Sequence, residues 1–300
     1  MHLQKRPVAR EIEREFAAFA GTGGLAAKHL GTGEEIRVNA EAVMPTASTI
    51  KVPILIEVFR QAEAGTVDLE QMLTVTEAVH VPGSGILRDP SLGVRLSVRD
   101  LATLMIVVSD NTATNLLIDL VGIDAVNRTL ADFGFAQTRL RRRIAFSPPG
   151  AQPRPLGVTT PAELADIMAA LATGTLLSAA SRDAILEIMR RQHDRDLIPR
   201  YLPFFPYADE LGEPDNGLRI ANKTGAVLGL RADMALVEWP GTRYAIGIVT
   251  EGDPDTRFWA ENEGGRVVGR VSRLIFDHFG GGELASPPRS AEQEQLAAGS

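Results

Sequence analysis

The order of its secondary-structure signals is the feature of this chain that most restricts its fold. Residues 24–30 and 35–39 are predicted strands, and the Gly31-Thr32-Gly33 between them is typical of a hairpin. Strand patterns return only near the other end, at residues 218–223, 232–239 and 243–250. A long helical stretch separates the two groups. We therefore expect one sheet that is built from both ends of the chain.

Helical periodicity predicts the elements that cover this sheet and form a second lobe. The predicted helices span residues 8–20, 49–64, 97–107, 112–121, 123–133, 161–173, 178–191 and 255–279. The expected fold class is α/β (α+β), with an antiparallel sheet flanked by helices and a separate all-helical lobe. One domain would span residues 8–279, with an α/β lobe at 8–43 and 200–279 and a helical lobe at 44–199. The Gly-, Ser-, Pro- and Gln-rich residues 280–300 are predicted to be a disordered tail.

Charge and composition exclude several classes of partner. The chain has 300 residues, a formal net charge of −7 and no apolar run long enough to span a membrane. An acidic balance argues against nucleic acid, whose phosphates need a basic face. The one basic cluster, residues 139–143, is interpreted as a solvated helix end or loop stem. We expect a small-molecule substrate and favour a monomer.

Cofactors and metals are not expected either. There is no cysteine, and the five histidines do not pair at metal-ligand spacing. The glycine-rich runs do not match a dinucleotide fingerprint. The first residues lack the apolar segment of a secretory signal. The sequence as it stands indicates a cytoplasmic protein, or an exported one whose leader has been removed.

Three short motifs carry the chemistry of the chain. They are Ser48-Thr49-Ile50-Lys51, then Ser109-Asp110-Asn111, then Lys223-Thr224-Gly225. Either tripeptide alone is expected well under about a tenth of a time by chance in a chain of this size. Their joint presence in order indicates a serine hydrolase that forms an acyl-enzyme.

The first motif supplies a nucleophile and its base. A serine hydroxyl is nearly inert until a neighbouring base takes its proton. Positions i and i+3 share a helix face, so Ser48 and Lys51 are predicted to lie in contact. Pro53 places the helix start here, and the backbone N–H of Ser48 would then be an oxyanion donor. Lys51 needs burial or a second cation to lower its pKa, and Lys223 is the candidate cation.

Over most of its length, from about residue 11 to 279, the chain resembles the class A β-lactamase family. This resemblance implies a β-lactamase/transpeptidase-like fold. The resemblance includes the three motifs, Gly83-Ser84-Gly85-Ile86-Leu87 and Thr159-Thr160-Pro161. It implies that Lys223 faces the nucleophile and contacts Ser109, which relays a proton to the leaving nitrogen. Asn111 would bind the substrate's side-chain amide and Thr224 its carboxylate.

The resemblance also implies roles for the end of the third motif and for the next strand. The N–H of Ala226 would be the second oxyanion donor. Gly225 leaves room for an acyl group along the strand edge. Arg231 is a candidate for binding the carboxylate, although pairing with Asp233 on the same strand face is the favoured interpretation. Ser84 has no glycines two positions away on either side, so it is not a nucleophile elbow.

One catalytic group of that family is missing. Class A enzymes use a loop glutamate to activate the water that hydrolyses the acyl-enzyme, and alignment puts Ile144 at that position. No Asp or Glu occurs between Asp132 and Glu163. The aspartate expected two residues before Thr159 is Gly157, which leaves Arg142 without that partner. Residues 147–155 are proline-rich and predict a stiff, different loop path, and Gln152 there could orient a water but not deprotonate it.

Three functions therefore remain open. The first is a β-lactamase-like hydrolase with slow deacylation. The second is a penicillin-binding-protein-like D,D-peptidase, or an esterase or amidase. The third is a sensor or binding protein that stays acylated or has kept only the pocket. The missing glutamate favours the last two, and the close match of the motifs favours the first.

Overall fold

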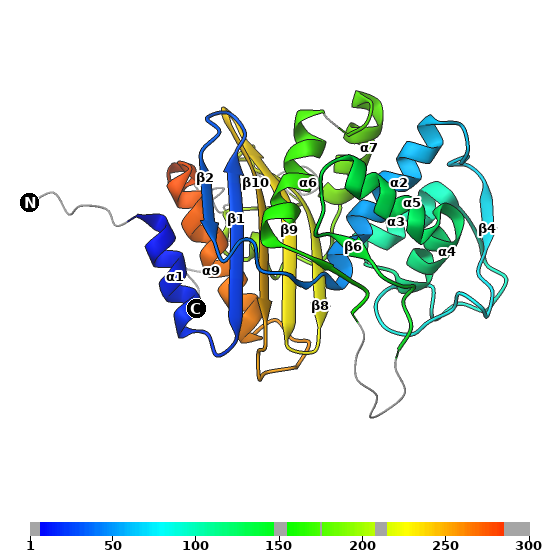
Figure 1. The fold of residues 1–300 in the computed structure, drawn as a ribbon, viewed down its shortest axis with the longest axis horizontal. Coiled ribbons are helices and arrows are strands. Elements are labelled where there is room, and N and C mark those ends of the chain that lie inside the picture. The colour runs from blue at the N-terminus through cyan, green and yellow to red at the C-terminus, as the bar shows by residue number, and fades with distance from the viewer. Residues whose placement is uncertain (1–6, 147–154, 175, 208–214, 285–300) are drawn as a thin grey trace, which may run out of the picture.

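A single antiparallel sheet joins the two ends of the chain. The computed structural model describes residues 7–146, 155–174, 176–207 and 215–284. The five strands run in the order β2-β1-β10-β9-β8 (Figure 1). They are β1 (Thr22–His29), β2 (Glu35–Val38), β8 (Arg219–Val227), β9 (Leu230–Trp239) and β10 (Thr242–Glu251). The pairing of β1 with β10 confirms the expectation that both termini build one sheet.

Helices cover both faces of this sheet. Helix α6 (Pro161–Thr173) packs on one face, and α1 (Val8–Ala18) and α9 (Glu263–His278) lie on the other (Figure 1). Alternate residues of β9 enter the two cores: Met234 joins the core that includes α6, while Ala235 joins the one that includes α1 and α9. The first eight residues of β9 are all buried, as expected for a strand that is covered on both faces.

The helical lobe stands beside the β8 edge of the sheet (Figure 1). It contains α2 (Lys51–Glu63), α3 (Val98–Val107), α4 (Asn111–Val121), α5 (Ile123–Asp132) and α7 (Ala179–Arg190). Helix α2 is its centre, since every residue from Lys51 to Phe59 is buried. A helix that is buried all round holds whatever functional groups it carries in fixed positions.

Five short strands were not predicted from the sequence. Strands β3 (Met44–Pro45), β6 (Arg139–Leu140) and β7 (Gly157–Thr159) form a small sheet, and β4 (Met72–Thr74) pairs with β5 (Arg95–Ser97). Segments of two or three residues are too short to show a period. The small sheet matters for the site, because β3 leads directly into the segment that carries Ser48.

Two predicted boundaries at the C-terminal end are wrong. The last helix starts at Glu263 rather than 255, because Asn262 caps it by accepting the Gly265 N–H at 3.1 Å. Before it, Asp253 accepts the Asp255 N–H at 2.9 Å and keeps that segment in a turn. The predicted tail also starts too early, since residues 281–283 form a short 3₁₀ helix and Leu284 packs on the core. The rest of that tail, residues 285–300, lies outside the described residues.

Across the described ranges, no helix is both long and apolar enough to cross a bilayer. The same ranges contain no group of three or more His, Cys, Asp or Glu side chains arranged to hold a metal ion.

Candidate active site

Ser48 lies in a tight turn at the entrance to α2. The turn is a 3₁₀ helix, η1 (Ala47–Ile50), and the α-helix proper begins only at Lys51. The residue before the serine, Ala47, has a φ of +43°, a left-handed conformation that costs free energy for any residue with a Cβ. Ser48 therefore sits on a strained turn, whereas the sequence predicted the first turn of a regular helix.

Strand β8 packs directly on this turn through Gly225. A Cβ at Gly225 would lie 2.9 Å from the backbone nitrogen of Ser48, and 3.0 Å from both the Ala47 Cβ and the Thr46 carbonyl oxygen. Any side chain at this position would push the strand and the turn apart. The glycine is thus required by the close approach of the nucleophile's own backbone, which is a different reason from the room for an acyl group that the sequence suggested.

The amine of Lys51 is enclosed by the Ser-Asp-Asn motif. Lys51 is fully buried, and its Nζ donates to the Ser109 carbonyl at 2.7 Å, to the Ser109 Oγ at 3.0 Å and to the Asn111 Oδ1 at 3.0 Å. Within the described residues, the Ser48 hydroxyl makes no hydrogen bond. The structure brings Lys51, Ser109 and Asn111 together, but among the described residues the expected direct contact between Ser48 and Lys51 is not a hydrogen bond. Such catalytic hydrogen bonds often form only when substrate is bound.

Both buried lysines have lowered pKa values. Burial lowers the pKa of Lys51 well below its ordinary value, the positive charge of Lys223 acts in the same direction, and Asp110 opposes them. Burial also lowers the pKa of Lys223 to about 8, against the opposing effect of Asp194 and Asp233. A pKa moved toward neutrality is what a general base needs in order to activate a serine hydroxyl.

Lys223 is engaged differently from the expectation. Its Nζ donates to the Thr224 carbonyl at 2.8 Å. In the part of the chain that the structure describes, no hydrogen bond joins it to Ser109. Its effect on Lys51 is therefore electrostatic in this state.

The middle residue of the Ser-Asp-Asn motif is structural. Asp110 caps α4 by accepting the Ala113 N–H at 2.8 Å, and its second oxygen accepts the N–H groups of Ile86 and Leu87 at 2.7 and 2.8 Å. Ser109, just before it, has a φ of +54°. The motif is thus locked between α4 and the loop after residue 82.

Arg231 neither pairs with Asp233 nor has a free guanidinium, so the favoured interpretation from sequence is wrong. It donates to the carbonyls of Val227, Leu230 and Arg257 at 3.1, 2.7 and 2.6 Å, and it is 6% exposed. Asp233 instead accepts the Ile198 N–H at 3.0 Å and the Asn222 amide. The guanidinium thus ties the β8–β9 turn to the loop before α9.

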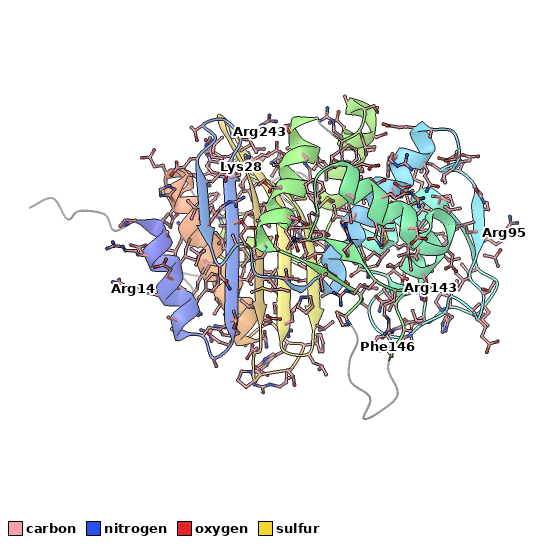
Figure 2. All side chains as sticks on the ribbon, viewed as in Figure 1. Arg14, Lys28, Arg95, Arg143, Phe146 and Arg243 are labelled. Carbon is pink, nitrogen blue, oxygen red and sulfur yellow. The ribbon has the colours of Figure 1, made fainter. Side chains whose placement is uncertain are left out.

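The segment after β6 places Ile144 next to α4. Arg142, which lacks the family's aspartate partner, donates to the carbonyls of Arg143 and Ala145 at 3.3 and 2.5 Å. Phe146 lies at the lower end of the helical lobe, near Arg143 (Figure 2), and is 60% exposed. The predicted proline-rich path falls mostly on residues 147–154, Gln152 included, and these lie outside the described residues.

Two residues near the motifs were not assigned a function from the sequence. Asn115 is bonded to the backbone of Ile144, and Ser84 donates to the Ser109 carbonyl at 2.8 Å. The glycines that flank Ser84 were a visible signal, and they entered the sequence-based prediction only as part of the family resemblance.

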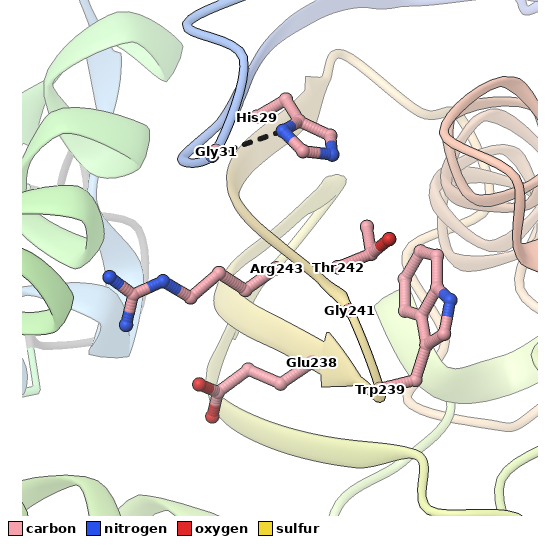
Figure 3. Close-up of a pocket in the computed structure, with 7 residues that line it drawn as sticks. All are labelled: His29, Gly31, Glu238, Trp239, Gly241, Thr242 and Arg243. Carbon is pink, nitrogen blue, oxygen red and sulfur yellow. Dashed lines mark hydrogen bonds between the residues drawn. The ribbon is translucent and has the colours of Figure 1, made fainter.

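A hollow of about 340 Å³ lies away from the motifs (Figure 3). It is lined by His29, Gly31, Glu238, Trp239, Gly241, Thr242 and Arg243. Glu238 pairs across the sheet with Arg219, at the end of β8 opposite Gly225. Two of its polar side chains are already engaged, since His29 accepts the N–H of Gly31 at 3.1 Å and Glu238 binds Arg190 at 3.1 Å. It has no part in the chemistry of Ser48.

The fold, together with a serine–lysine pair at the junction of its two lobes, defines the class of β-lactamases and penicillin-binding transpeptidases. The model of the β-lactamase enzyme family matches residues 7–279, and the chain belongs to that family.

Named relatives and solved structures agree with this membership. The β-lactamase AST-1 of Nocardia asteroides is 31% identical over 270 residues, which cover 86% of this chain and 79% of that protein. A crystal structure of a β-lactamase from Sphaerobacter thermophilus superposes with a TM-score of 0.81 at 33% identity, covering 91% of this chain and 97% of the other. The structure of PBP-A superposes with a TM-score of 0.77 at 30% identity, covering 91% and 95%. A leucine-to-glutamate mutant of PBP-A is known as an acyl-enzyme complex with penicillin G.

Proposed function

We propose that this chain is a serine hydrolase that opens β-lactam amides through an acyl-enzyme on Ser48 and releases the acyl group slowly. The observation that carries the proposal is the amine of Lys51, a residue that follows Ser48 by one helical turn. This amine is fully buried, and its pKa lies well below the ordinary value. A neutral amine at that place can accept the proton of the serine.

Acylation follows from the groups around Lys51. The Ser48 oxygen attacks the lactam carbonyl carbon, and its proton passes to Lys51. The carbon–nitrogen bond then breaks, and the proton moves through Ser109 to the leaving nitrogen. Ser109 is suited to this relay because its hydroxyl already accepts a hydrogen bond from Lys51 at 3.0 Å. The N–H groups of Ser48 and Ala226 would stabilise the oxyanion.

Residues of the second and third motifs are proposed to bind the substrate. Asn111 donates one amide proton to the Pro82 carbonyl at 3.2 Å, which leaves its second proton for the substrate's side-chain amide. Lys223 and Thr224 would hold the carboxylate. Arg231 would contribute indirectly, since it donates to three backbone carbonyls that shape the end of β8.

Deacylation should be slow because the water has no carboxylate to activate it. Ile144 stands at the aligned position, and the sequence from 133 to 162 contains no acid. A general base typically contributes about 10²–10⁴-fold to such a step.

The test is intact-protein mass spectrometry after mixing with benzylpenicillin, with free drug followed in the same tube. We expect one adduct on the protein that forms faster than it decays, and no adduct on Ser48→Ala. An adduct that persists in Ser48→Ala would sink the assignment of the nucleophile. Fast loss of drug with no accumulating adduct would show an efficient route to deacylation.

A second function is favoured by one specific observation, the missing carboxylate in a chain 30% identical to PBP-A. A D,D-peptidase or esterase could use the same acylation machinery on a peptide or small ester. Release of D-alanine from a peptide that ends in D-alanyl-D-alanine, at a rate above that of benzylpenicillin turnover, would select this alternative.

A further inference from the structure

The loop Gly83-Ser84-Gly85 is built onto the Ser-Asp-Asn motif. Both glycines have positive φ, +99° and +100°, and a Cβ on Gly85 would lie 2.4 Å from the Cα of Asp110. A Cβ on Gly83 would lie 2.6 Å from the Asn111 Nδ2. The carbonyl of Ser84 accepts the Asn111 N–H at 3.0 Å. Two glycines thus let the backbone approach closely, and Ser84 carries the one side chain among the three.

The hydroxyl of Ser84 shares its acceptors with Lys51. Its Oγ donates to the Ser109 carbonyl at 2.8 Å and lies 3.3 Å from the Asn111 Oδ1. The same two oxygens accept protons from the Lys51 Nζ, at 2.7 and 3.0 Å. The hydroxyl and the amine are therefore two donors that share one pair of oxygens, each of which can accept two hydrogen bonds.

The protonation state of Lys51 decides how many of these acceptors it can satisfy. A charged Lys51 has three N–H groups and the structure gives it three acceptors. The neutral amine has two N–H groups and a lone pair. When Lys51 becomes neutral, one acceptor loses its donor, and a buried acceptor without a donor costs free energy.

We propose that Ser84 is a positioning residue for the base: its hydroxyl donates to the oxygen that Lys51 releases, and so favours the neutral amine. The role of Lys51 as a base rests on the proposed function, whereas the exchange of donors does not. Rotation about the Cβ–Oγ bond is enough to move the hydroxyl proton between the Ser109 carbonyl and the Asn111 Oδ1.

The charged groups near the amine lie on other residues than Ser84. Lys223 on β8 and Asp110 at the start of α4 are the charged groups that act on the pKa of Lys51. On α2 itself, Glu57 and Arg60 are paired with each other at 2.7 Å. A substitution at Ser84 alters none of these charges.

The direct test is an NMR titration of Lys51 in the protein without substrate. The chain has four lysines, Lys5, Lys28, Lys51 and Lys223, so lysine labelled with ¹³C at Cε gives few signals, and Lys51→Arg assigns the one of interest. In Ser84→Ala, the two oxygens keep only Lys51 as their donor and stabilise the ammonium. The midpoint for Lys51 should then rise by about half to one pH unit.

Two variants control this titration. Ser84→Thr keeps the hydroxyl and should titrate like the native protein. Ser91→Ala removes an exposed hydroxyl further along the same segment and should also leave the midpoint unchanged. An unchanged midpoint in Ser84→Ala, or an equal shift in Ser84→Thr, overturns the inference.

A kinetic measurement separates this inference from the proposed function. The acidic limb of the acylation rate with benzylpenicillin should move upward in Ser84→Ala by the same amount as the NMR midpoint. If the native protein forms no adduct while the NMR midpoint shifts, the proposed function fails and the donor exchange stands. If acylation occurs and neither limb nor midpoint moves, the inference fails and the proposed function stands.

Discussion

The side-chain amide of Asn115 makes hydrogen bonds with both backbone groups of Ile144, its N–H and its carbonyl. The Ile144 N–H donates to the Asn115 Oδ1 at 2.9 Å, and the Asn115 Nδ2 donates to the Ile144 carbonyl at 3.0 Å. Asn115 follows Asn111 by four residues on α4, so the two amides share a helix face. The amide of Asn111 accepts a hydrogen bond from Lys51, and the amide of Asn115 holds Ile144. The position that lacks the glutamate is thus tied rigidly to the catalytic helix.

This link predicts the effect of restoring the carboxylate. In Ile144→Glu, the new side chain should start from a backbone already held one helical turn from Asn111, and it can then activate water. We expect the decay of the benzylpenicillin adduct to speed up by at least about tenfold, within the range that a general base supplies. Mass spectrometry of the adduct after removal of free drug measures this rate directly.

The control for Ile144→Glu is Ala145→Glu, which introduces the same charge on the next residue, where the side chain is exposed. It should leave the decay unchanged. Equal decay in Ile144→Glu and the native protein would mean that the side chain at 144 does not reach the ester of the adduct.

Gly225→Ala tests the close approach of β8 to the nucleophile. Its Cβ would meet the Ser48 nitrogen at 2.9 Å, a backbone atom that cannot move without shifting the whole turn. We expect acylation to fall by roughly 10²-fold, the usual cost of displacing one oxyanion donor, with the thermal midpoint lowered by a few degrees. The acylation rate and a thermal melt together measure the two effects.

Gly265→Ala is the matched control for Gly225→Ala. It lies in α9, where a Cβ would meet nothing nearer than a Leu197 methyl at 3.3 Å. Alanine in a helix should be neutral or slightly stabilising, and acylation should not change. If Gly225→Ala acylates as fast as this control, the turn tolerates displacement and the argument from close approach is wrong.

The lowered pKa values of the two lysines predict a bell-shaped pH profile for acylation. As the proposed base, Lys51 can act only when neutral, so the rate should rise as pH passes upward through its pKa, which burial holds well below the ordinary value. In the proposed function Lys223 binds the carboxylate, which it can do only when charged, so the rate should fall as pH passes upward through its pKa of about 8. Acylation rates across pH 5 to 10 should therefore show an alkaline limb near pH 8.

Replacing Lys223 by arginine separates the two limbs. Arginine stays charged throughout this range, so the alkaline limb should disappear in Lys223→Arg even if the maximal rate drops. An alkaline limb that remains near pH 8 in this variant belongs to another group.

The sequence predicted the architecture of this protein because periodicity and motif order are local signals. The sheet from both termini and the main helices follow from them. The partners of Lys51 could not be predicted in the same way. Helical spacing favoured Ser48, but the amine is long enough to reach Ser109 and Asn111 across the lobe, and burial strengthens those hydrogen bonds.

Arg231 and the start of α9 show the same limit. Two residues that share a strand face, such as Arg231 and Asp233, were expected to pair. The fold instead brings the carbonyl of Arg257 to the guanidinium and the N–H of Ile198 to the carboxylate. These contacts come from loops distant in sequence, whose paths are set by side-chain turns that have no period.

A buried acid on α2 gives the last prediction. Glu57 is fully buried, and its carboxylate accepts hydrogen bonds from Arg60, Gln61 and Thr129, each at 2.7 Å. Burial alone would raise the pKa of Glu57, but these three donors hold it below its ordinary value. The carboxylate thus joins α2, which carries Lys51, to α5.

In Glu57→Gln, an amide N–H₂ replaces an acceptor among groups that are themselves donors. We expect the free energy of unfolding at pH 7 to fall by about 2–4 kcal/mol, as when one partner of a buried charged pair is removed.

The loss of stability in Glu57→Gln should depend on pH. Because the pKa of Glu57 is lower in the folded protein, the stabilisation by its carboxylate is present above the unfolded-state pKa and is lost as pH falls through the folded-state pKa. The difference between native protein and variant should therefore shrink below about pH 4, near the reference pKa of a glutamate. Urea unfolding at pH 7 and pH 3.5 measures the free energy of unfolding of the native protein and the variant under both conditions. The control is Glu13→Gln, which changes an exposed residue of α1. A constant difference at the two pH values would show that the charge of Glu57 contributes nothing and that only its shape matters.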